Sequence, residues 1–385
     1  ADIEGVSTYN YSDPCFHYEH LFLKKKITVL PSVFGELNIG RYKGVISKSV
    51  RFLFDSFRIL MFWGLPSGWK IVRKILFSKA ENATIDRIAE SDYIISKGGS
   101  FICNENTIRE KIALLRFVYI FFVAFKLNRK VVILCQSVGP VYGGFSRKLI
   151  NYLLNRSHTV VLREELCRTN YDYLDLKGSN ICLSNDIAFY LNTKDAETKV
   201  LPIDKSKLNI GFTIKDVTPS LRQCYLKMIA DAITFCVEKY NAHIHIFPHV
   251  TIDNDVEVSY KVHKMLSDAC KGNVFVYNED YTAPELKKVY SGMNVFVGTR
   301  LHSTIFAMGE YVPSVCISYH GTKSLGIFNN YGLGEYAVTE YSSEDLIQKL
   351  QKLIEKRVVI ADEIKKMHVI YKQRHLDIFK SIFHK

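Results

Sequence analysis

The sequence predicts an α/β protein made of two doubly wound domains with a helical C-terminal tail. Short apolar runs of strand length alternate with segments of helical period along most of the chain. Most of these runs are apolar throughout, which is typical of parallel strands that helices cover on both faces. A polar stretch near residue 200 interrupts the alternation, and the same pattern stands on both sides of it.

The predicted elements follow one another as such domains require. Strands are predicted at residues 92–96, 130–135, 158–163, 208–214, 243–247, 274–277, 294–298 and 313–318. Helical periodicity between them covers residues 108–127, 146–154, 221–240 and 284–290. From about Ser343 to the end, the pattern is helical only.

The stretch NTKDAETKVLPIDKSK, residues 192–207, is the expected linker because it is polar and lacks apolar periodicity. We therefore expect an N-terminal domain over residues 1–195 and a C-terminal domain over residues 206–385, which includes the helical tail. Two such domains that face one another place a cleft between the carboxyl ends of their strands, where ligands bind in this fold class.

Composition and charge restrict the classes of function. The 385 residues are 48% hydrophobic, and the formal charge of +12 indicates an anionic partner: a phosphorylated small molecule, acidic lipid or nucleic acid. Nucleic acid is the least favoured, because the sequence shows no known nucleic-acid-binding module and no basic-aromatic repeat.

Neither a metal nor another cofactor is expected. The nine cysteines are scattered and form no C-x-x-C pair, which indicates a reducing compartment and argues against structural zinc. There is no H-E-x-x-H motif, and the close pair His243 and His245 matches alternation along a strand. No secretion signal is evident, so we expect a cytoplasmic protein, with the inner face of the membrane as a second location.

Small and polar residues gather where predicted strands end. These segments are residues 98–99, 136–140, 163–164, 211–213, 247–249 and 298–303. Each alone is ordinary turn chemistry. Together they describe a ligand site built from backbone N–H groups and a few charged side chains.

The segment GTRLHS, residues 298–303, carries the strongest chemical signal. A helix that begins just after Gly298 presents unpaired N–H groups and a partial positive charge, and Arg300 adds a guanidinium there. His302 can donate to an oxyanion or move a proton near neutral pH. The alternative is structural: Arg300 pairs with a surface carboxylate, and His302 is a satisfied, half-buried residue.

A series of motifs resembles the polysaccharide pyruvyl transferase family. In chain order they are GVSTYNYSD (5–13), KGGS (97–100), QSVGP (136–140), LRE (162–164), NDIAF (185–189), PH (248–249) and GTRLHS (298–303). The resemblance covers residues 5–327, and GTRLH is its most specific part. It implies two Rossmann-like halves in a GT-B-like arrangement, phosphoenolpyruvate as the donor, and a sugar hydroxyl pair that becomes a cyclic pyruvate ketal. The acceptor would be a glycan or a lipid-linked saccharide.

The resemblance and the residue chemistry together assign candidate residues. The candidate catalytic residues are His302, Arg300, Asp13 and Asp186, although both aspartates are equally compatible with helix caps. The expected donor-binding residues are Arg163, His249, Gly298, Thr299, Arg300, Leu301, His302, Ser303 and Lys323. Asn10, Gly98, Gly99, Gln136 and Gly139 are expected to line the acceptor side of the cleft.

Two other functions remain open at the level of the sequence. A nucleotide-sugar glycosyltransferase of the GT-B type would give the same strand-end pattern and similar charge. A non-enzymatic module for acidic polymers would explain the charge but not GTRLH.

Residues 51–79 also mix aromatic and basic side chains, which suits peripheral contact with an anionic membrane. The alternative is that these aromatics complete the core of the first domain.

Overall fold

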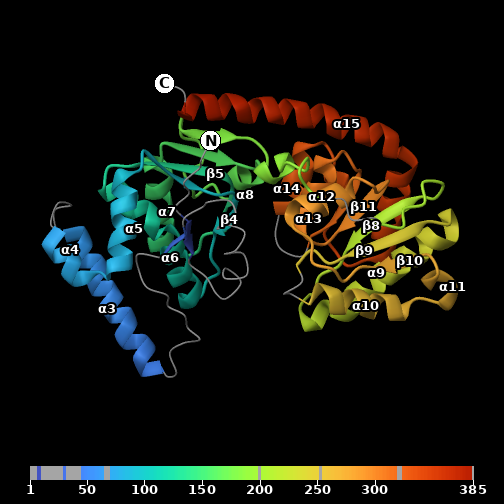
Figure 1. Ribbon diagram of the computed structural model, residues 1–385, viewed down its shortest axis with the longest axis horizontal. Helices are drawn as coiled ribbons and strands as arrows, with labels where there is room; N and C mark the ends of the chain where they lie inside the picture. Colours follow the sequence, from blue (N-terminus) through green and yellow to red (C-terminus); the bar gives the residue numbers. More distant parts are fainter. Residues whose placement is uncertain are drawn as a thin grey trace. The chain divides into compact units, whose positions relative to one another are not determined.

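The computed structural model describes residues 7–9, 29–31, 45–64, 70–197, 201–250, 254–318 and 323–383. The chain groups into two compact units (Figure 1). The first comprises Ala1–Val161 and Cys167–Cys182, and the second comprises Leu162–Leu166 and Leu183–Lys385. This division lies upstream of the polar stretch at 192–207. One reason is that Asn330 donates to the carbonyl oxygen of Arg163 at 2.8 Å, which ties residue 163 to the second unit.

The first unit is built around a sheet with the strand order β3-β5-β6-β7. These strands are Tyr93–Ser96, Lys130–Val138, Thr159–Leu162 and Ile181–Leu183, and β4 (Gly99–Ile102) also pairs with β5. Its helices are α3 (Val45–Gly64), α4 (Lys70–Leu76), α5 (Lys79–Glu90), α6 (Ile108–Lys126), α7 (Gly144–Arg156) and α8 (Leu166–Asn170). Two short strands, β1 (Ser7–Tyr9) and β2 (Val29–Pro31), form a separate parallel pair. Eight consecutive buried residues make β5 the centre of the sheet, which is why its sequence is apolar rather than alternating.

The second unit contains a parallel sheet with the order β10-β9-β8-β11-β12-β13. Its strands are β8 (Asn209–Thr213), β9 (His243–Phe247), β10 (Val274–Val276), β11 (Val295–Gly298), β12 (Ser314–Ile317) and β13 (Ala337–Val338). Counted along the chain, this is the order 3-2-1-4-5-6 of the Rossmann fold. The order reverses between β8 and β11, so a crevice for ligands is expected at the carboxyl ends of these two strands.

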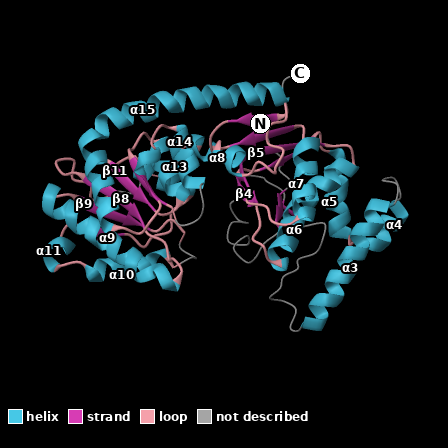
Figure 2. Cartoon of the chain, turned by 180° about the vertical axis from the view of Figure 1, so that it is seen from behind, coloured by secondary structure: helices cyan, strands magenta, loops and turns pink. Residues whose placement is uncertain are grey.

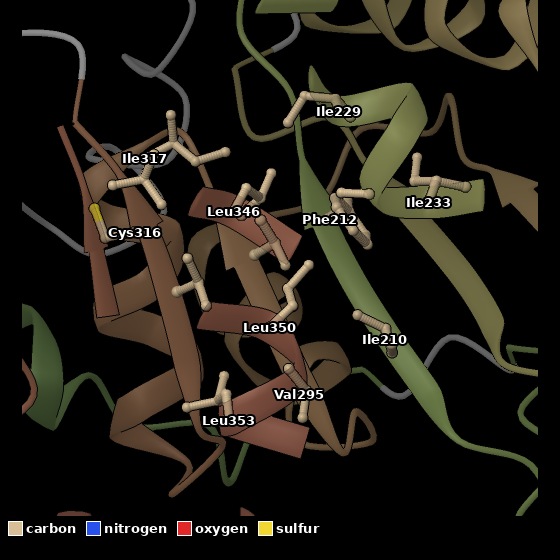
Figure 3. Packing of buried hydrophobic residues seen from close by; sticks show 14 of the residues in the cluster. Ile210, Phe212, Ile229, Ile233, Val295, Cys316, Ile317, Leu346, Leu350 and Leu353 are labelled. Carbon is tan, nitrogen blue, oxygen red and sulfur yellow. The ribbon is translucent and has the colours of Figure 1, made fainter. Parts of the chain in front are cut away.

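Helices cover both faces of this sheet, as a doubly wound fold requires (Figure 2). They are α9 (Pro219–Tyr240), α10 (Asp255–Met265), α11 (Asp268–Lys271), α12 (Ala283–Tyr290), α13 (Leu301–Gly309), α14 (Lys323–Asn330) and α15 (Ser343–Phe383), with short 3₁₀ helices η1 (Ile187–Tyr190) and η3 (Gly334–Tyr336). On one face, α15 turns Leu346, Leu350 and Leu353 toward the sheet, where they pack with Val295 and Phe212 (Figure 3). Spacings of four and three residues place these leucines on one side of the helix.

The predicted fold class is confirmed, and the tail is one helix that begins at Ser343 as expected. Two details differ at the ends of strands in the first unit. The strand predicted to end at Cys135 continues to Val138, so Gln136 lies inside it and is fully buried. Gly99 begins a further strand, β4, rather than ending β3. Both differences arise because pairing of β4 with β5 extends the sheet.

Candidate functional site

The GTRLHS segment lies where the strand order of the second unit reverses. β11 ends at Gly298, which is in register with Thr213, the last residue of β8. Helix α13 begins at Leu301, and Arg300 is its extended N-cap residue without a side-chain capping bond. The first N–H groups of a helix lack partners within the helix, so this end attracts negative charge.

Hydroxyl groups and one glycine fix the turn between β11 and α13. The Ser303 hydroxyl donates to the carbonyl oxygen of Arg300 at 2.6 Å and also pairs with the Thr213 hydroxyl at 2.6 Å. The Thr299 hydroxyl pairs with the buried Tyr225 hydroxyl at 2.7 Å. A Cβ atom at Gly298 would lie 2.5 Å from the Thr304 methyl group, so glycine is needed for this close approach. The turn therefore holds residues 300–302 in a defined position.

Arg300 forms a two-point ion pair with a carboxylate that the sequence did not single out. Its Nη2 and Nε atoms donate to the two oxygens of Asp255 at 2.7 and 3.1 Å. The Asp255 side chain is fully buried, and it also accepts from the backbone N–H of Val250 at 2.9 Å. The structural alternative for Arg300 was an ion pair with a surface carboxylate. Asp255 instead lies in the first turn of α10 and is buried. The pair fixes the plane of the guanidinium group.

His302 lies beside a second buried ion pair. Arg163 Nη1 donates to Asp186 Oδ2 at 2.6 Å, and His302 Nε2 is 3.9 Å from the same oxygen. Half of the His302 side chain is exposed, whereas Asp186 is almost fully buried. Asp186 Oδ1 accepts from the N–H of Ala188, so this aspartate does cap a short helix, η1. Desolvation lowers the pKa of His302; the Asp186 carboxylate opposes this shift and Arg163 adds to it. His302 is therefore mostly neutral at pH 7 in the free protein.

His249 is partly buried near Arg300 and His302. Its Nδ1 atom is 3.2 Å from the hydroxyl of buried Tyr290, and its ring contacts that of Phe306. Burial lowers the pKa of His249 to about 3, and Arg300 and, in acid, protonated His302 add to this shift. We call Arg163, Asp186, His249, Asp255, Arg300 and His302 the switch-point cluster.

Most of the chain matches one known protein family. The sequence model of the polysaccharide pyruvyl transferase family matches residues 9–321. The chain belongs to this family. One relative is the amylovoran biosynthesis protein AmsJ of Erwinia amylovora, which is 24% identical over 318 residues, covering 77% of this chain and 74% of AmsJ.

Solved structures place this transferase in the GT-B-like fold. HepE of Anabaena, crystallised with UDP and glucose, has a TM-score of 0.54 at 12% identity, covering 98% of this chain and 91% of HepE. A glycosyltransferase of Rickettsia africae has a TM-score of 0.55 at 10% identity, covering 99% of this chain and 91% of that one. UDP-GlcNAc 2-epimerase of Neisseria meningitidis has a TM-score of 0.51 at 13% identity, covering 94% of this chain and 90% of the epimerase. At such identities the likeness establishes the fold alone.

The structure of this transferase brings together most of the predicted donor-side residues. Arg163, His249, Arg300 and His302 belong to the switch-point cluster, and Gly298, Thr299, Leu301 and Ser303 form the turn beneath it. Lys323 is the first residue of α14, whose Gly326 lies against the Glu164 side chain next to Arg163. Sequence reasoning missed Asp255 and Tyr290. The only signal for Asp255 was an acidic residue in the first turn of a helix, which is common.

The predicted acceptor residues fall in the first unit or outside the described residues. Gly98 and Gly99 lie beside β5, and Gln136 Nε2 donates to the carbonyl oxygen of Lys97 at 2.8 Å. The Gln136 Oε1 atom is buried without a hydrogen-bond partner. At Gly139 the ring of Tyr171 is so close that a Cβ atom would overlap it. Asn10 and Asp13 lie outside the described residues.

Within the ranges given above, no three histidine, cysteine or acidic side chains are grouped as a metal site would require. None of the described helices is long and apolar enough to cross a membrane.

Buried histidines of this transferase predict a loss of stability in acid. His245 in β9 is fully buried between the Tyr277 hydroxyl and Asn209 Oδ1, at 2.9 and 3.0 Å. Burial lowers its pKa to about 4 from an ordinary value of 6.5. Below pH 6.5 His245 becomes protonated in the unfolded chain but stays neutral in the folded protein. The contribution of neutral His245 to the free energy of unfolding is therefore complete above pH 6.5 and is lost as the pH falls toward 4. Between pH 7.5 and 5 we expect His245 alone to remove about 2 kcal/mol.

Urea denaturation at the two pH values measures this effect. His245→Gln should lower stability at pH 7.5 but reduce the difference between pH 7.5 and 5 by about 2 kcal/mol. His158→Gln is the matched control, because His158 is exposed. An unchanged pH difference in His245→Gln would show that other groups dominate acid unfolding.

Proposed function

We propose that this protein transfers the three-carbon group of phosphoenolpyruvate onto a hydroxyl pair of a sugar in a glycan or a lipid-linked glycan precursor. The products are a cyclic pyruvate ketal and inorganic phosphate. The observation that carries the proposal is the switch-point cluster: two arginines and a half-exposed histidine meet at the start of α13. Membership of the polysaccharide pyruvyl transferase family supports it.

The reaction needs proton transfer and stabilisation of a leaving phosphate. One sugar hydroxyl adds to the central carbon of phosphoenolpyruvate while the methylene carbon gains a proton. The bond from that central carbon to the phosphate oxygen then breaks, and the second hydroxyl closes the ring. Of the two hydroxyl protons, one ends on the new methyl group and the other on phosphate. No oxidant, metal or other cofactor is required for this balance.

Five residues of the cluster have a part in this proposal. Arg300 and Arg163, with the N–H groups at the start of α13, stabilise the negative charge on the departing phosphate. Neutral His302 accepts a hydroxyl proton and passes it on as imidazolium. Asp186 orients Arg163 and His302, and Asp255 orients Arg300. Lys323 is a further candidate for the phosphate.

An assay with both donor classes tests the proposal. The protein is incubated with a panel of glycans and either phosphoenolpyruvate or nucleotide sugars, and the released phosphate or nucleotide is measured. We expect phosphate release, together with a pyruvyl mass added to one acceptor in mass spectrometry. Release of nucleotide with transfer of a sugar would instead establish the glycosyltransferase alternative, which the same fold accommodates.

Arg300→Lys tests whether the guanidinium geometry matters. Lysine keeps the positive charge but cannot bond both Asp255 oxygens and a phosphate in one plane. We expect donor affinity, measured by calorimetry with phosphoenolpyruvate, to fall by about tenfold or more. Arg222→Lys is the matched control, because Arg222 also pairs with an aspartate but is partly exposed. Equal donor affinities for Arg300→Lys and the parent would argue against contact with the phosphate.

A further inference from the structure

Helix α3 in the first unit is inverted compared with an ordinary surface helix. Among its described side chains, residues 53–64, the charged Asp55 and Arg58 are buried. Several of its large apolar side chains face solvent instead, with Leu53 66%, Phe57 52% and Leu60 71% exposed, whereas Phe62 is buried. Spacings of four and three residues place these three on one side of the helix. Surface helices normally turn such residues toward the core.

A buried ion network fixes this orientation. Arg58 pairs with Asp55 at 2.8 Å and with Glu81 of α5 at 2.7 Å. It also donates to the carbonyl oxygen of Leu76 at the end of α4, and its guanidinium lies 4.6 Å from the ring centre of Phe77. Rotating α3 to bury its apolar side would separate these buried charges, which is strongly unfavourable. The apolar side is thus held outward.

Helix α4, which lies next to α3, also exposes large apolar side chains. Ile71 and Ile75 are each 78% exposed and lie one turn apart, and Lys74 between them is also exposed. Trp63 lies at the end of α3, and its carbonyl oxygen accepts from Lys126 of α6 at 2.8 Å. The Lys126 ammonium group also lies 5.7 Å from the centre of the Trp63 ring. Figures 1 and 2 both show α3 and α4 next to each other at the margin of the first unit. Exposed apolar residues on both helices are therefore accompanied by cations.

We propose that α3 and α4 are a docking surface for an anionic lipid bilayer. Apolar side chains with lysines and a tryptophan beside them match the boundary between lipid headgroups and acyl chains. The formal charge of +12 favours an anionic partner and disfavours a second copy of the same chain. In this proposal α3 lies on the bilayer rather than through it, because its other side packs against the unit through Asp55 and Arg58. This inference does not depend on the proposed reaction.

Vesicle flotation with the full chain tests the surface. Vesicles of phosphatidylcholine alone are compared with vesicles that also contain phosphatidylglycerol. We expect at least about tenfold stronger binding to the anionic vesicles, weakened by added salt. The variant Leu53→Ser/Phe57→Ser/Leu60→Ser should bind the anionic vesicles about tenfold less or weaker still.

A matched control separates this surface from general apolar exposure. Val358, Val359 and Val369 of α15 are 69%, 60% and 62% exposed, so replacing all three by serine removes similar exposed apolar groups elsewhere. This control should float like the parent, and thermal melts should show both variants folded. Equal flotation of the parent and the α3 variant would overturn the proposal. So would a parent that binds no vesicles but forms a dimer that the α3 variant abolishes, because α3 would then contact a second copy.

Discussion

Replacing His302 by alanine should lower turnover with phosphoenolpyruvate by about 10²–10⁴-fold, while the affinity for the donor changes little. The reason is that the proposed proton transfer occurs only during reaction, whereas the arginines that hold the phosphate are unaltered. Turnover and calorimetric donor binding are measured on the same preparation. Half of the His302 side chain is exposed, so truncation should leave the melting temperature nearly unchanged.

Two comparisons make the His302 result decisive. His263→Ala, on α10 of the same unit, is the control and should retain activity. Because the pKa of His302 is lowered and the neutral ring starts the reaction, parent activity should fall only below pH 6.5, as the ring becomes protonated. A folded His302→Ala protein with nearly parental turnover would end the catalytic assignment, whichever donor is used.

Replacing Asp255 by alanine should lower the free energy of unfolding by about 3–5 kcal/mol. The Arg300 guanidinium would then remain largely enclosed without the Asp255 carboxylate, and the N–H of Val250 would lose the same carboxylate. Urea denaturation at pH 7.5 measures the change. Asp268→Ala is the control, because that carboxylate pairs with Lys271 at the surface and should contribute little.

The double variant Asp255→Leu/Arg300→Met separates the two roles of this pair. Replacing both charges with apolar side chains should recover much of the stability that Asp255→Ala loses. If Arg300 binds the donor, donor affinity should stay low despite the recovered stability. Recovery of both stability and donor binding would assign the pair a structural role only.

Much of the fold could be predicted from the sequence because the local patterns of apolar residues match the strands and helices of the structure. Strands such as Val295–Gly298 are apolar runs of the kind that a sheet covered on both faces requires. Helices such as Pro219–Tyr240 have clear beginnings and periodicity. The short strand Ala337–Val338 has no such signal, since two residues carry no period and their pairing with β12 depends on the rest of the sheet.

The sequence by itself determined the fold class, the start of the C-terminal helix and the polar segment GTRLHS, because strand runs, helical period and strand-end residues are local patterns. Only the tertiary structure decided which charges meet. Arg300 pairs with Asp255, 45 residues away in the sequence, because the segments that follow the parallel strands β9 and β11 meet at the carboxyl edge of one sheet. Arg163 pairs with Asp186 beside His302, although β6 and β11 belong to different sheets. The outward apolar side of α3 was likewise decided by tertiary structure. Its helical period allows either orientation, and the buried contact of Arg58 with Glu81 selects one.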